Sequence, residues 1–468
     1  MLLTWISLII QILIAYLFSG QPWFQPNLNR ISWVIIAVVS AVFIIEVCSK
    51  YTKDKYYNKY SIMIILLGFF ARIFFLWWER NYRHIFNLIH SGPDAYAFIL
   101  YVYIALQVGH TDYFRSSEAM NYVYILFYLM QMVGLQRILA QFLNLLLGVS
   151  SIFIAFSAVK KLNISVTSAN LMITLAMLMP NFMFLNVVLL REAFIVFFIT
   201  ISIYLFIVWF KKDSLFILIL SFIALLGAAH FHRASIAVAG GYVVTYIFYD
   251  RKNNSFKPRP FSIVAATIML VLYLIVNAVP GIAIFAAFQD LTIDHFIDFA
   301  TETRPDLLGE AGYRAFIPLG NPYLEFVVNS PIRMLYLIFS PMPWYWRNMG
   351  DIIAFVLVSI PYMVFYFMTI RYLILNKKRS ENKNLIIALL ITSMFSIWVF
   401  SWGTRNAGTA MRHRDKFLMQ HIIMLTLTLK TKEDFYFFLS MLHPKLKNLN
   451  RNTRFKIVKI EKSTGETT

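Results

Sequence analysis

The chain has 468 residues and a net charge of +19; 59% of the residues are hydrophobic, 17% aromatic and only 14% charged. Soluble domains are about 45–50% apolar and about 25% charged, so this composition excludes a soluble globular enzyme, a disordered chain and a nucleic-acid-binding domain. A lipid bilayer suits so much apolar surface, and the basic excess then indicates cytoplasmic loops of a membrane protein rather than contact with nucleic acid.

Apolar stretches long enough to cross a bilayer, about 17–25 residues, recur along the whole chain. The first, 2–18, lacks a basic start and a small-residue cleavage site, so we interpret it as a membrane helix rather than a cleaved signal. Shorter stretches need local thinning of the bilayer or burial among neighbours. The clear spans are 2–18, 31–48, 61–78, 165–185, 193–209, 261–280, 351–370 and 385–401, and the shorter ones are 214–229, 235–249 and 417–429.

The hydrophilic gaps fall into two alternating sets, which differ in the kind of basic residue. One set is placed in the cytoplasm and holds 26 basic residues, 20 of them lysine; the rest of the chain holds 16, of which 15 are arginine and one is Lys416. Lysine is sufficient for topology, whereas the planar fork of arginine matches phosphate and carboxylate. The outer arginines are therefore expected to bind an anion. The cytoplasmic set is 48–59, 160–161, 211–212, 250–259, 371–383 and the tail from Lys430.

Alternation of the two sets leaves the number of crossings open at one place. Between Trp78 and Lys160 an odd number is required, and three apolar stretches, 96–108, 120–134 and 138–159, lie there. Either all three cross or only one does, which gives 14 or 12 crossings with both termini in the cytoplasm. We predict a single transmembrane domain, 1–429, with two large outer loops at about 79–118 and 281–350, followed by a basic cytoplasmic tail, 430–468.

The first outer loop offers carboxylates at the membrane surface. Asp94 follows Gly92-Pro93, so it either caps the next helix or acts as a general base; Asp112 and Glu118 follow it. Arg191 and Glu192 then form an adjacent pair at an outer turn between apolar runs. They either cap the next helix or line a site beneath the outer loops.

Two later turns carry basic and aromatic residues. His230 and His232 lie two apart, a spacing that suits a strand better than metal ligation from a helix, and the adjacent Arg233 favours anion binding. The sole cysteine, Cys48, excludes a disulfide and a cysteine-based metal cluster. Prolines and aromatics in 339–351 then predict a re-entrant or interfacial turn that presents Arg347 and Asp351.

The segment SWGTRNAGTAMRHRDKFLM, 401–419, concentrates basic residues on the outer side, where topology disfavours them. A multivalent anion, such as the diphosphate of a lipid carrier, explains this cluster; general contact with lipid headgroups is the alternative. The chain has no P-loop, dinucleotide-binding, zincin or hydrolase signature. The cluster consists of Arg405, Arg412, His413, Arg414 and Lys416.

The order of these features resembles the GT-C glycosyltransferases, polytopic enzymes that use polyprenyl-phosphate sugars. PDAYAFILYVYIALQVG (93–109) and the run from YVYILFYLMQMVG to SAVKKL (122–162) look like the amino-terminal half of that family, and LLREAF (189–194) resembles its next acidic turn. SPMPWYW (340–346) and AMRHRDKF (410–417) are similar to bacterial members that build surface polysaccharide. The resemblance implies an all-α GT-C-like fold of about 12 (12–14) transmembrane helices, with Asp94 at the position of the catalytic acid.

These features together lead to the hypothesis of a glycosyltransferase or polysaccharide polymerase in the cell membrane, working at its outer face on capsule- or O-antigen-like glycans. The donor is a glycan on a polyprenyl phosphate or diphosphate and the acceptor is another glycan; nucleic acid is not a partner. A divalent Mg or Mn ion is left open. The alternatives are a flippase for a lipid-linked glycan and a structural assembly subunit. The predicted site is catalytic Asp94 with substrate-binding Arg405, Arg412, Arg414, Arg233, Arg191, Glu192, His232 and Arg347.

Overall fold

The fold is described from a computed structural model of the chain. It covers residues 1–21, 25–51, 53–85, 88, 93–109, 111, 118–134, 136–257, 264, 297–298, 311–313, 315–376 and 380–429. Almost all of this part is helical, and the only strands within it are β1 (Tyr249–Asp250) and β2 (Ser255–Phe256), which form one hairpin. The predicted tail, 430–468, and most of 258–310 lie outside the described residues.

The helices have the following bounds. The first half contains α1 (Leu2–Phe18), η1 (Gln25–Asn27), α2 (Leu28–Cys48), α3 (Lys59–Asn81), α4 (Pro93–Val108), α5 (Glu118–Val133), α6 (Arg137–Lys161), α7 (Val166–Leu178), α8 (Pro180–Val187) and α9 (Glu192–Lys212). The second half contains α10 (Leu215–Phe231), η2 (Arg233–Ile236), α11 (Ala237–Phe248), α16 (Pro322–Phe339), η4 (Pro343–Tyr345), α17 (Met349–Ala354), η5 (Phe355–Ser359), α18 (Ile360–Leu375), α19 (Glu381–Trp402), α20 (Ala407–Asp415) and α21 (Leu418–Thr428).

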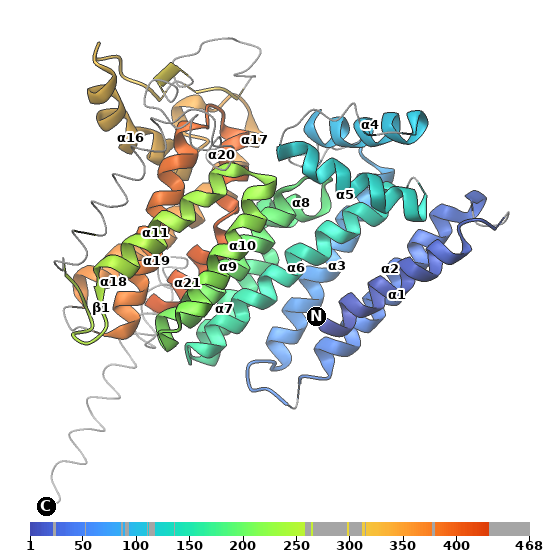
Figure 1. Cartoon of the computed structure of the whole chain (residues 1–468), viewed down its shortest axis with the longest axis horizontal. Helices are drawn as coiled ribbons and strands as arrows, with labels where there is room; N and C mark the ends of the chain where they lie inside the picture. The colour runs from blue at the N-terminus through green and yellow to red at the C-terminus, as the bar shows by residue number, and fades with distance from the viewer. Residues whose placement is uncertain are drawn as a thin grey trace, which may run out of the picture.

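The long helices run side by side as one bundle (Figure 1). In it α9 packs against α6 and α10, and α19 packs against α11 and α16. Among the described residues, six helices are long and apolar enough to span a bilayer, and the bent pair α7 and α8 is a seventh if it is one span. The six are α2, α3, α6, α9, the continuous Met349–Leu375 and α19.

The prediction of a mostly helical membrane protein is confirmed, whereas the count of about 12 crossings and the GT-C fold stay predictions. Five more apolar helices, among them α1, α10 and α21, have only 10–17 residues. The predicted span 261–280 lies outside the described residues apart from 264. In the region where parity left a choice, α4 and α5 lie across the end of the bundle while α6 runs along it (Figure 1), which favours a single crossing there.

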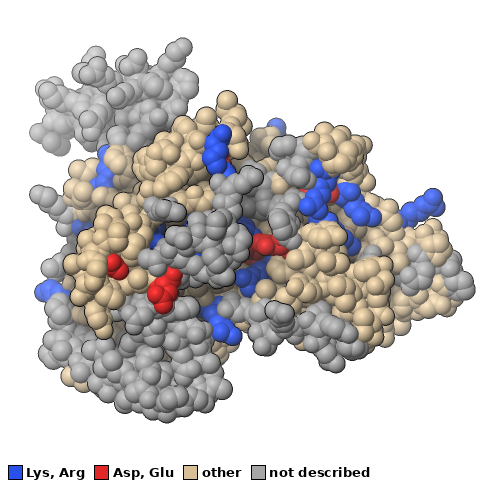
Figure 2. Space-filling view, turned by 90° about the horizontal axis from the view of Figure 1, so that it is seen from above, with Lys and Arg blue, Asp and Glu red and all other residues tan. Residues whose placement is uncertain are grey.

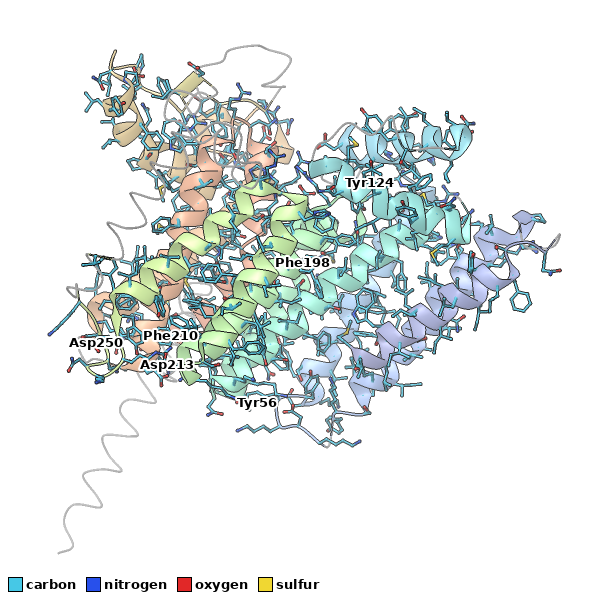
Figure 3. All side chains as sticks on the ribbon, viewed as in Figure 1. Tyr56, Tyr124, Phe198, Phe210, Asp213 and Asp250 are labelled. Atoms are coloured by element: carbon cyan, nitrogen blue, oxygen red, sulfur yellow. The ribbon has the colours of Figure 1, made fainter. Side chains whose placement is uncertain are left out.

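The two sets of hydrophilic segments lie at opposite ends of the bundle. At one end, Lys160 pairs with Asp54, Lys211 with Glu381 (2.9 Å) and Arg251 with Asp213 (2.8 Å). Tyr56, Asp213 and Asp250 mark this end in Figure 3. At the other end, Arg412 pairs with Asp94, Arg137 with Glu79 and Arg347 with Asp351. We call these the lysine end and the arginine end; the placement of the lysine end in the cytoplasm stays a prediction.

A proline separates the helices α7 and α8, whose axes are bent by 52° relative to each other. Pro180 has no N–H, so the carbonyl of Ala176 loses its helical donor. The buried guanidinium of Arg72, on α3, donates to the carbonyls of Ala176 (3.4 Å), Met177 (2.8 Å) and Gly68 (2.9 Å). Freed backbone groups inside a bilayer must find such partners within the protein. Arg72 therefore has a structural function at the break.

Replacing Arg72 by leucine is expected to destabilise the fold by about 2–4 kcal/mol, because each buried carbonyl left without a donor costs about 1–3 kcal/mol. Reversible unfolding in mixed micelles measures this loss. The matched control is Arg30→Leu on α2, where the side chain is exposed. Equal stability of the two variants would contradict the structural function of Arg72.

Candidate functional site

A second break, between α8 and α9, positions the Arg191–Glu192 pair. The amide of Gln141 donates to the carbonyl of Val187 (2.9 Å), and the amide of Asn144 donates to those of Val188 (3.1 Å) and Leu190 (2.8 Å). Both amides come from α6, three residues apart and so on one helix face. They hold the extended residues directly before Arg191. Gln141 and Asn144 were not among the residues predicted from the sequence, although two amides on one face of an apolar helix are a signal that could have found them.

Arg191 and Glu192 use their charges differently. The guanidinium of Arg191 donates to the carbonyl of Phe231 at 2.6 Å and so satisfies the end of α10. Glu192 begins α9, where the helix dipole favours a carboxylate. It is buried, and within the described part of the chain its Oε2 accepts no hydrogen bond. The positive charges that act most strongly on it are those of Lys416, Arg412 and Arg191.

Arg412 joins two distant segments of the chain. Its Nη1 lies 2.6 Å from Oδ2 of Asp94, which stands in the first turn of α4, 318 residues away. The side chain of Asp94 is 57% exposed and that of Arg412 is 21% exposed, so a ligand outside the bundle can reach both. Burial lowers the pKa of Arg412, but the carboxylates of Glu192 and Asp94 outweigh it and raise the pKa above its usual value. Arg412 is therefore a cation held between two carboxylates.

Two imidazoles lie beside this cation. The rings of His232 and His413 meet edge to face with 5.3 Å between centroids, and both pack on Phe400. The hydroxyl of Thr404 donates to the carbonyl of Phe400 (2.7 Å), so its oxygen accepts from Nδ1 of His413 (2.9 Å). This bond leaves Nε2 of His413 as the ring's lone-pair nitrogen.

Both imidazoles are neutral at pH 7. Burial lowers the pKa of His413 and the pKa of His232 well below their usual range, and the nearby charge of Lys416 lowers both further. Lys416 itself is buried at the end of α20, with its ammonium 5.0 Å from the centre of the Phe400 ring. The positive charge of the site therefore comes from Arg412, Lys416 and Arg191 rather than from the imidazoles.

The structure thus brings together five of the nine residues predicted from the sequence, at the arginine end. Figure 2 looks onto this end and shows basic and acidic side chains reaching the surface close together near its middle. We call this group the Asp94–Arg412 site. From the predicted set it contains Asp94, Arg191, Glu192, His232 and Arg412, and the structure adds His413 and Lys416.

Arg414 lies on the opposite face of α20 from Arg412, because residues two apart on a helix do not share a face. Its guanidinium is buried and donates to the carbonyls of Ile338 (2.6 Å) and Ser340 (2.7 Å) and to the Ser359 hydroxyl (3.2 Å). The structure therefore does not bring Arg414 to the site. It fastens α20 to the end of α16 and to η5.

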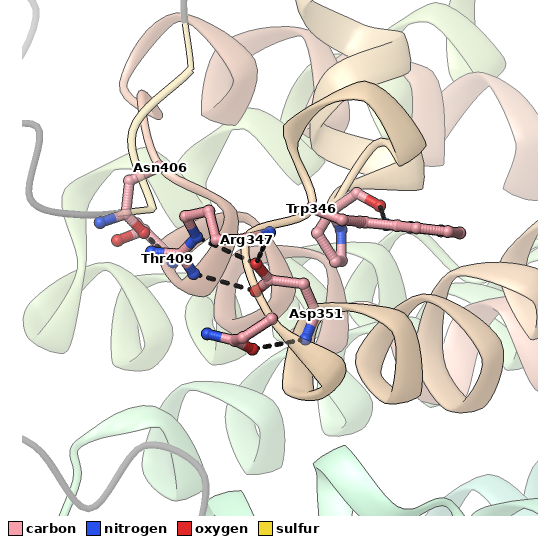
Figure 4. A network of polar contacts seen from close by, with 7 residues as sticks. Trp346, Arg347, Asp351, Asn406 and Thr409 are labelled. Carbon is pink, nitrogen blue, oxygen red and sulfur yellow. Dashed lines mark hydrogen bonds and ion pairs between the residues drawn. The ribbon is translucent and has the colours of Figure 1, made fainter.

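The other predicted arginines stand on other segments: Arg347 before α17, Arg405 before α20 and Arg233 on η2. Arg347 forms a fork with Asp351, with two distances of 2.9 Å, next to Asn406 and Thr409 at the start of α20 (Figure 4). Arg405 lies in an extended segment, and its backbone carbonyl accepts a hydrogen bond from the Tyr313 amide at 2.9 Å. Arg233 is exposed on η2, directly after His232.

The structure describes part of the two large outer loops. Of the other acidic candidates, Asp112 lies outside the described residues and Glu118 begins α5. Residues 281–310, apart from 297–298, are also outside them. In the part of the chain that is described, no three histidine, cysteine or acidic side chains come together in a way that could hold a metal ion.

Comparison with known proteins found no matching family model, no similar curated protein and no similar solved structure.

Arg412→Gln and Arg414→Gln form a matched pair on one helix with expected losses of stability of different size. Arg414→Gln strands buried carbonyls and is expected to lower the free energy of unfolding by about 2–4 kcal/mol. Arg412→Gln removes a partly exposed ion pair and is expected to cost less than about 1 kcal/mol. Unfolding in mixed micelles measures both. If Arg412→Gln were the more damaging change, Arg412 would be a structural residue instead of an accessible cation.

The neutral histidines predict a pH dependence of stability. Unfolded histidine binds a proton below about pH 6.5, whereas the folded pKa values lie well below this, so each imidazole lowers the unfolding free energy by up to about 1.4 kcal/mol per pH unit as pH falls below 6.5. Burial raises the pKa of Asp415 to about 6, which acts in the opposite direction. The measurement is therefore the difference between wild-type and His413→Asn from pH 5 to 8. We expect a shallower loss below pH 6.5 in the variant, and parallel curves would contradict the neutral state of His413.

Proposed function

We propose that this protein is a membrane glycosyltransferase or polysaccharide polymerase that takes a sugar or oligosaccharide from a polyprenyl phosphate or diphosphate at the arginine end of the bundle. The observation that carries the proposal is the 2.6 Å contact between Asp94 and Arg412. Such a transfer needs a base for the acceptor hydroxyl and a cation for the leaving phosphate. These two groups come from opposite ends of the sequence and meet at one accessible place.

The chemistry assigned to the site is a displacement at the anomeric carbon. The acceptor oxygen forms a bond to this carbon, and its proton passes to the carboxylate of Asp94. The bond from the anomeric carbon to the phosphate oxygen breaks, and the electron pair leaves with the lipid phosphate. Arg412 stabilises the negative charge on that leaving group, and the fixed charges of Lys416 and Arg191 add to the positive potential.

The ion pair gives this reaction an order. While Arg412 holds Asp94, the carboxylate is occupied by a charge-assisted hydrogen bond. An incoming phosphate competes for the same guanidinium, and Glu192 keeps a second negative charge near it from the buried side. Donor binding then releases the exposed Asp94 to accept a proton from the acceptor hydroxyl. The donor is accordingly expected to bind before the acceptor.

The geometry of the intramembrane charges supports an enzyme over a flippase. A flippase for lipid-linked glycans needs charges along a path through the membrane. The two charges deep in apolar runs are Arg72 and Glu46. Arg72 is occupied by backbone carbonyls, and the Glu46 carboxylate accepts from the hydroxyl (2.8 Å) and amide (3.1 Å) of Thr4. Both charges are thus committed to local structure.

The test is the profile of lipid-linked and polymerised surface glycan in cells that carry Asp94→Asn or Arg412→Lys at matched protein levels. Loss of a general base is expected to reduce transfer by about 10²–10⁴-fold. Arg412→Lys keeps the charge but loses the fork, so transfer is again expected to fall. Short lipid-linked units should accumulate on the outer leaflet while long chains disappear.

The control is a second ion pair of similar exposure at the lysine end, Asp213 and Arg251, with side chains 64% and 26% exposed. Asp213→Asn and Arg251→Lys should leave the glycan profile unchanged. Accumulation of lipid-linked units only on the cytoplasmic leaflet would show that the protein is a flippase rather than an enzyme. A normal profile in the Asp94 and Arg412 variants would remove both residues from the mechanism.

A further inference from the structure

A groove opens on the surface at the lysine end, where α2 ends and α3 begins. It has a volume of about 440 Å³, which lies within the usual range of small-molecule sites, about 300–1,000 Å³. Its lining is apolar except for one ammonium group, that of Lys59 at the first turn of α3. The lining residues are Cys48, Tyr51, Lys59, Ile62, Met63 and Leu66.

The turn beside the groove is held firmly against the bundle. The hydroxyl of Tyr56 donates to the carbonyl of Ile164 at 2.9 Å, and the buried ring of Tyr57 packs edge to face on Phe156 with 5.4 Å between centroids. Lys160, at the end of α6, pairs with Asp54. These contacts fix the turn between α2 and α3, so its outward side chains keep defined positions.

The outward side chains of this turn are cationic. Lys53, Lys55 and Lys59 are exposed. The one carboxylate of the turn, Asp54, is neutralised by Lys160 from another helix, so it does not cancel their charge. Three exposed lysines in seven residues, directly beyond a membrane helix, are the kind of basic cluster that attracts anionic headgroups.

The apolar part of the groove continues from this cationic rim along α3. From Lys59 to Leu66 the helix rises about 10 Å, at 1.5 Å per residue. Met63 is 55% exposed on this face, and Tyr51 and Tyr60 are exposed at the same end, as expected for side chains at a membrane interface. Lys59 at one end of an apolar surface groove, with Lys53 and Lys55 on the adjoining turn, matches the two halves of an anionic lipid.

We propose that this groove binds one anionic glycerophospholipid of the bilayer, with its phosphate at Lys53, Lys55 and Lys59 and an acyl chain along Ile62, Met63 and Leu66. Charge complementarity selects the headgroup, and the apolar lining accepts the chain. The groove lies at the opposite end of the bundle from the Asp94–Arg412 site. The inference therefore stands independently of the proposed transfer reaction.

The sole cysteine of the chain supplies the readout. Cys48 is exposed and lines the groove, so a bound lipid should shield its thiol from maleimide. The purified full-length protein in a nonionic detergent is titrated with dioleoylphosphatidylglycerol or dioleoylphosphatidylcholine, and the rate of Cys48 labelling is measured. We expect half-maximal protection at a concentration about tenfold lower for the anionic lipid, because several lysines near an anionic headgroup act together.

The contribution of the lysine charges is tested with two matched triple variants and one control triple variant. K53Q/K55Q/K59Q should lose the preference for the anionic lipid, whereas K53R/K55R/K59R, which keeps the charge, should retain it. K212Q/K252Q/K257Q removes three exposed lysines elsewhere at the same end and should behave as wild-type. Thermal unfolding confirms that each variant is folded before labelling.

Three results would overturn the proposal. Equal protection by the two lipids would show that the lysines do not recognise the headgroup, and no protection by either would show that the groove holds no lipid. Protection by a polyprenyl phosphate but not by dioleoylphosphatidylglycerol would assign the groove to the carrier lipid. Unchanged glycan transfer in the Asp94→Asn and Arg412→Lys variants, with the anionic-lipid preference intact, would count against the proposed function alone.

Discussion

Backbone carbonyls that lose their helical donors inside an apolar bundle need new donors from the protein itself, and much of this structure follows from that requirement. At the break at Pro180, Arg72 donates hydrogen bonds to the carbonyls. At the break before Arg191, the amides of Gln141 and Asn144 donate to them. In each case a polar side chain on an otherwise apolar helix stabilises an irregular segment of its neighbour.

The same requirement divides the arginines into two groups. Arg333 donates to the carbonyls that end α19, including that of Thr404 at 2.9 Å, and Arg414 donates to those that end α16. Arg412 instead meets carboxylates at a place that solvent can reach. The preference for arginine at this end therefore has a structural cause as well as the proposed anion-binding one. In the proposed function, it is Arg412 that exchanges its carboxylate partner for the phosphate of the donor.

The two ends of the bundle differ in their basic residues, and we assign a different function to each end. At the arginine end, rigid forks and a buried lysine surround Glu192 and Asp94. At the lysine end, Lys59 lines an apolar groove, and Lys53 and Lys55 are exposed on the adjoining turn. In the functions proposed above, the first end handles a phosphate that leaves during a reaction, and the second holds a lipid that remains in the bilayer.

The sequence by itself determined the class of protein, the position of most helices and the separation of lysine from arginine, because hydropathy and charge are local properties of the chain. The sequence predicts the stretch 165–185 as one span, whereas the structure bends it at Pro180. The sequence also singled out Asp94 and Arg412, since charges beside apolar runs are conspicuous. Only the tertiary structure decided that these two meet, because 318 residues separate them. It alone decided that Arg414, two residues from Arg412, faces buried carbonyls, because helix packing determines which face of α20 is buried.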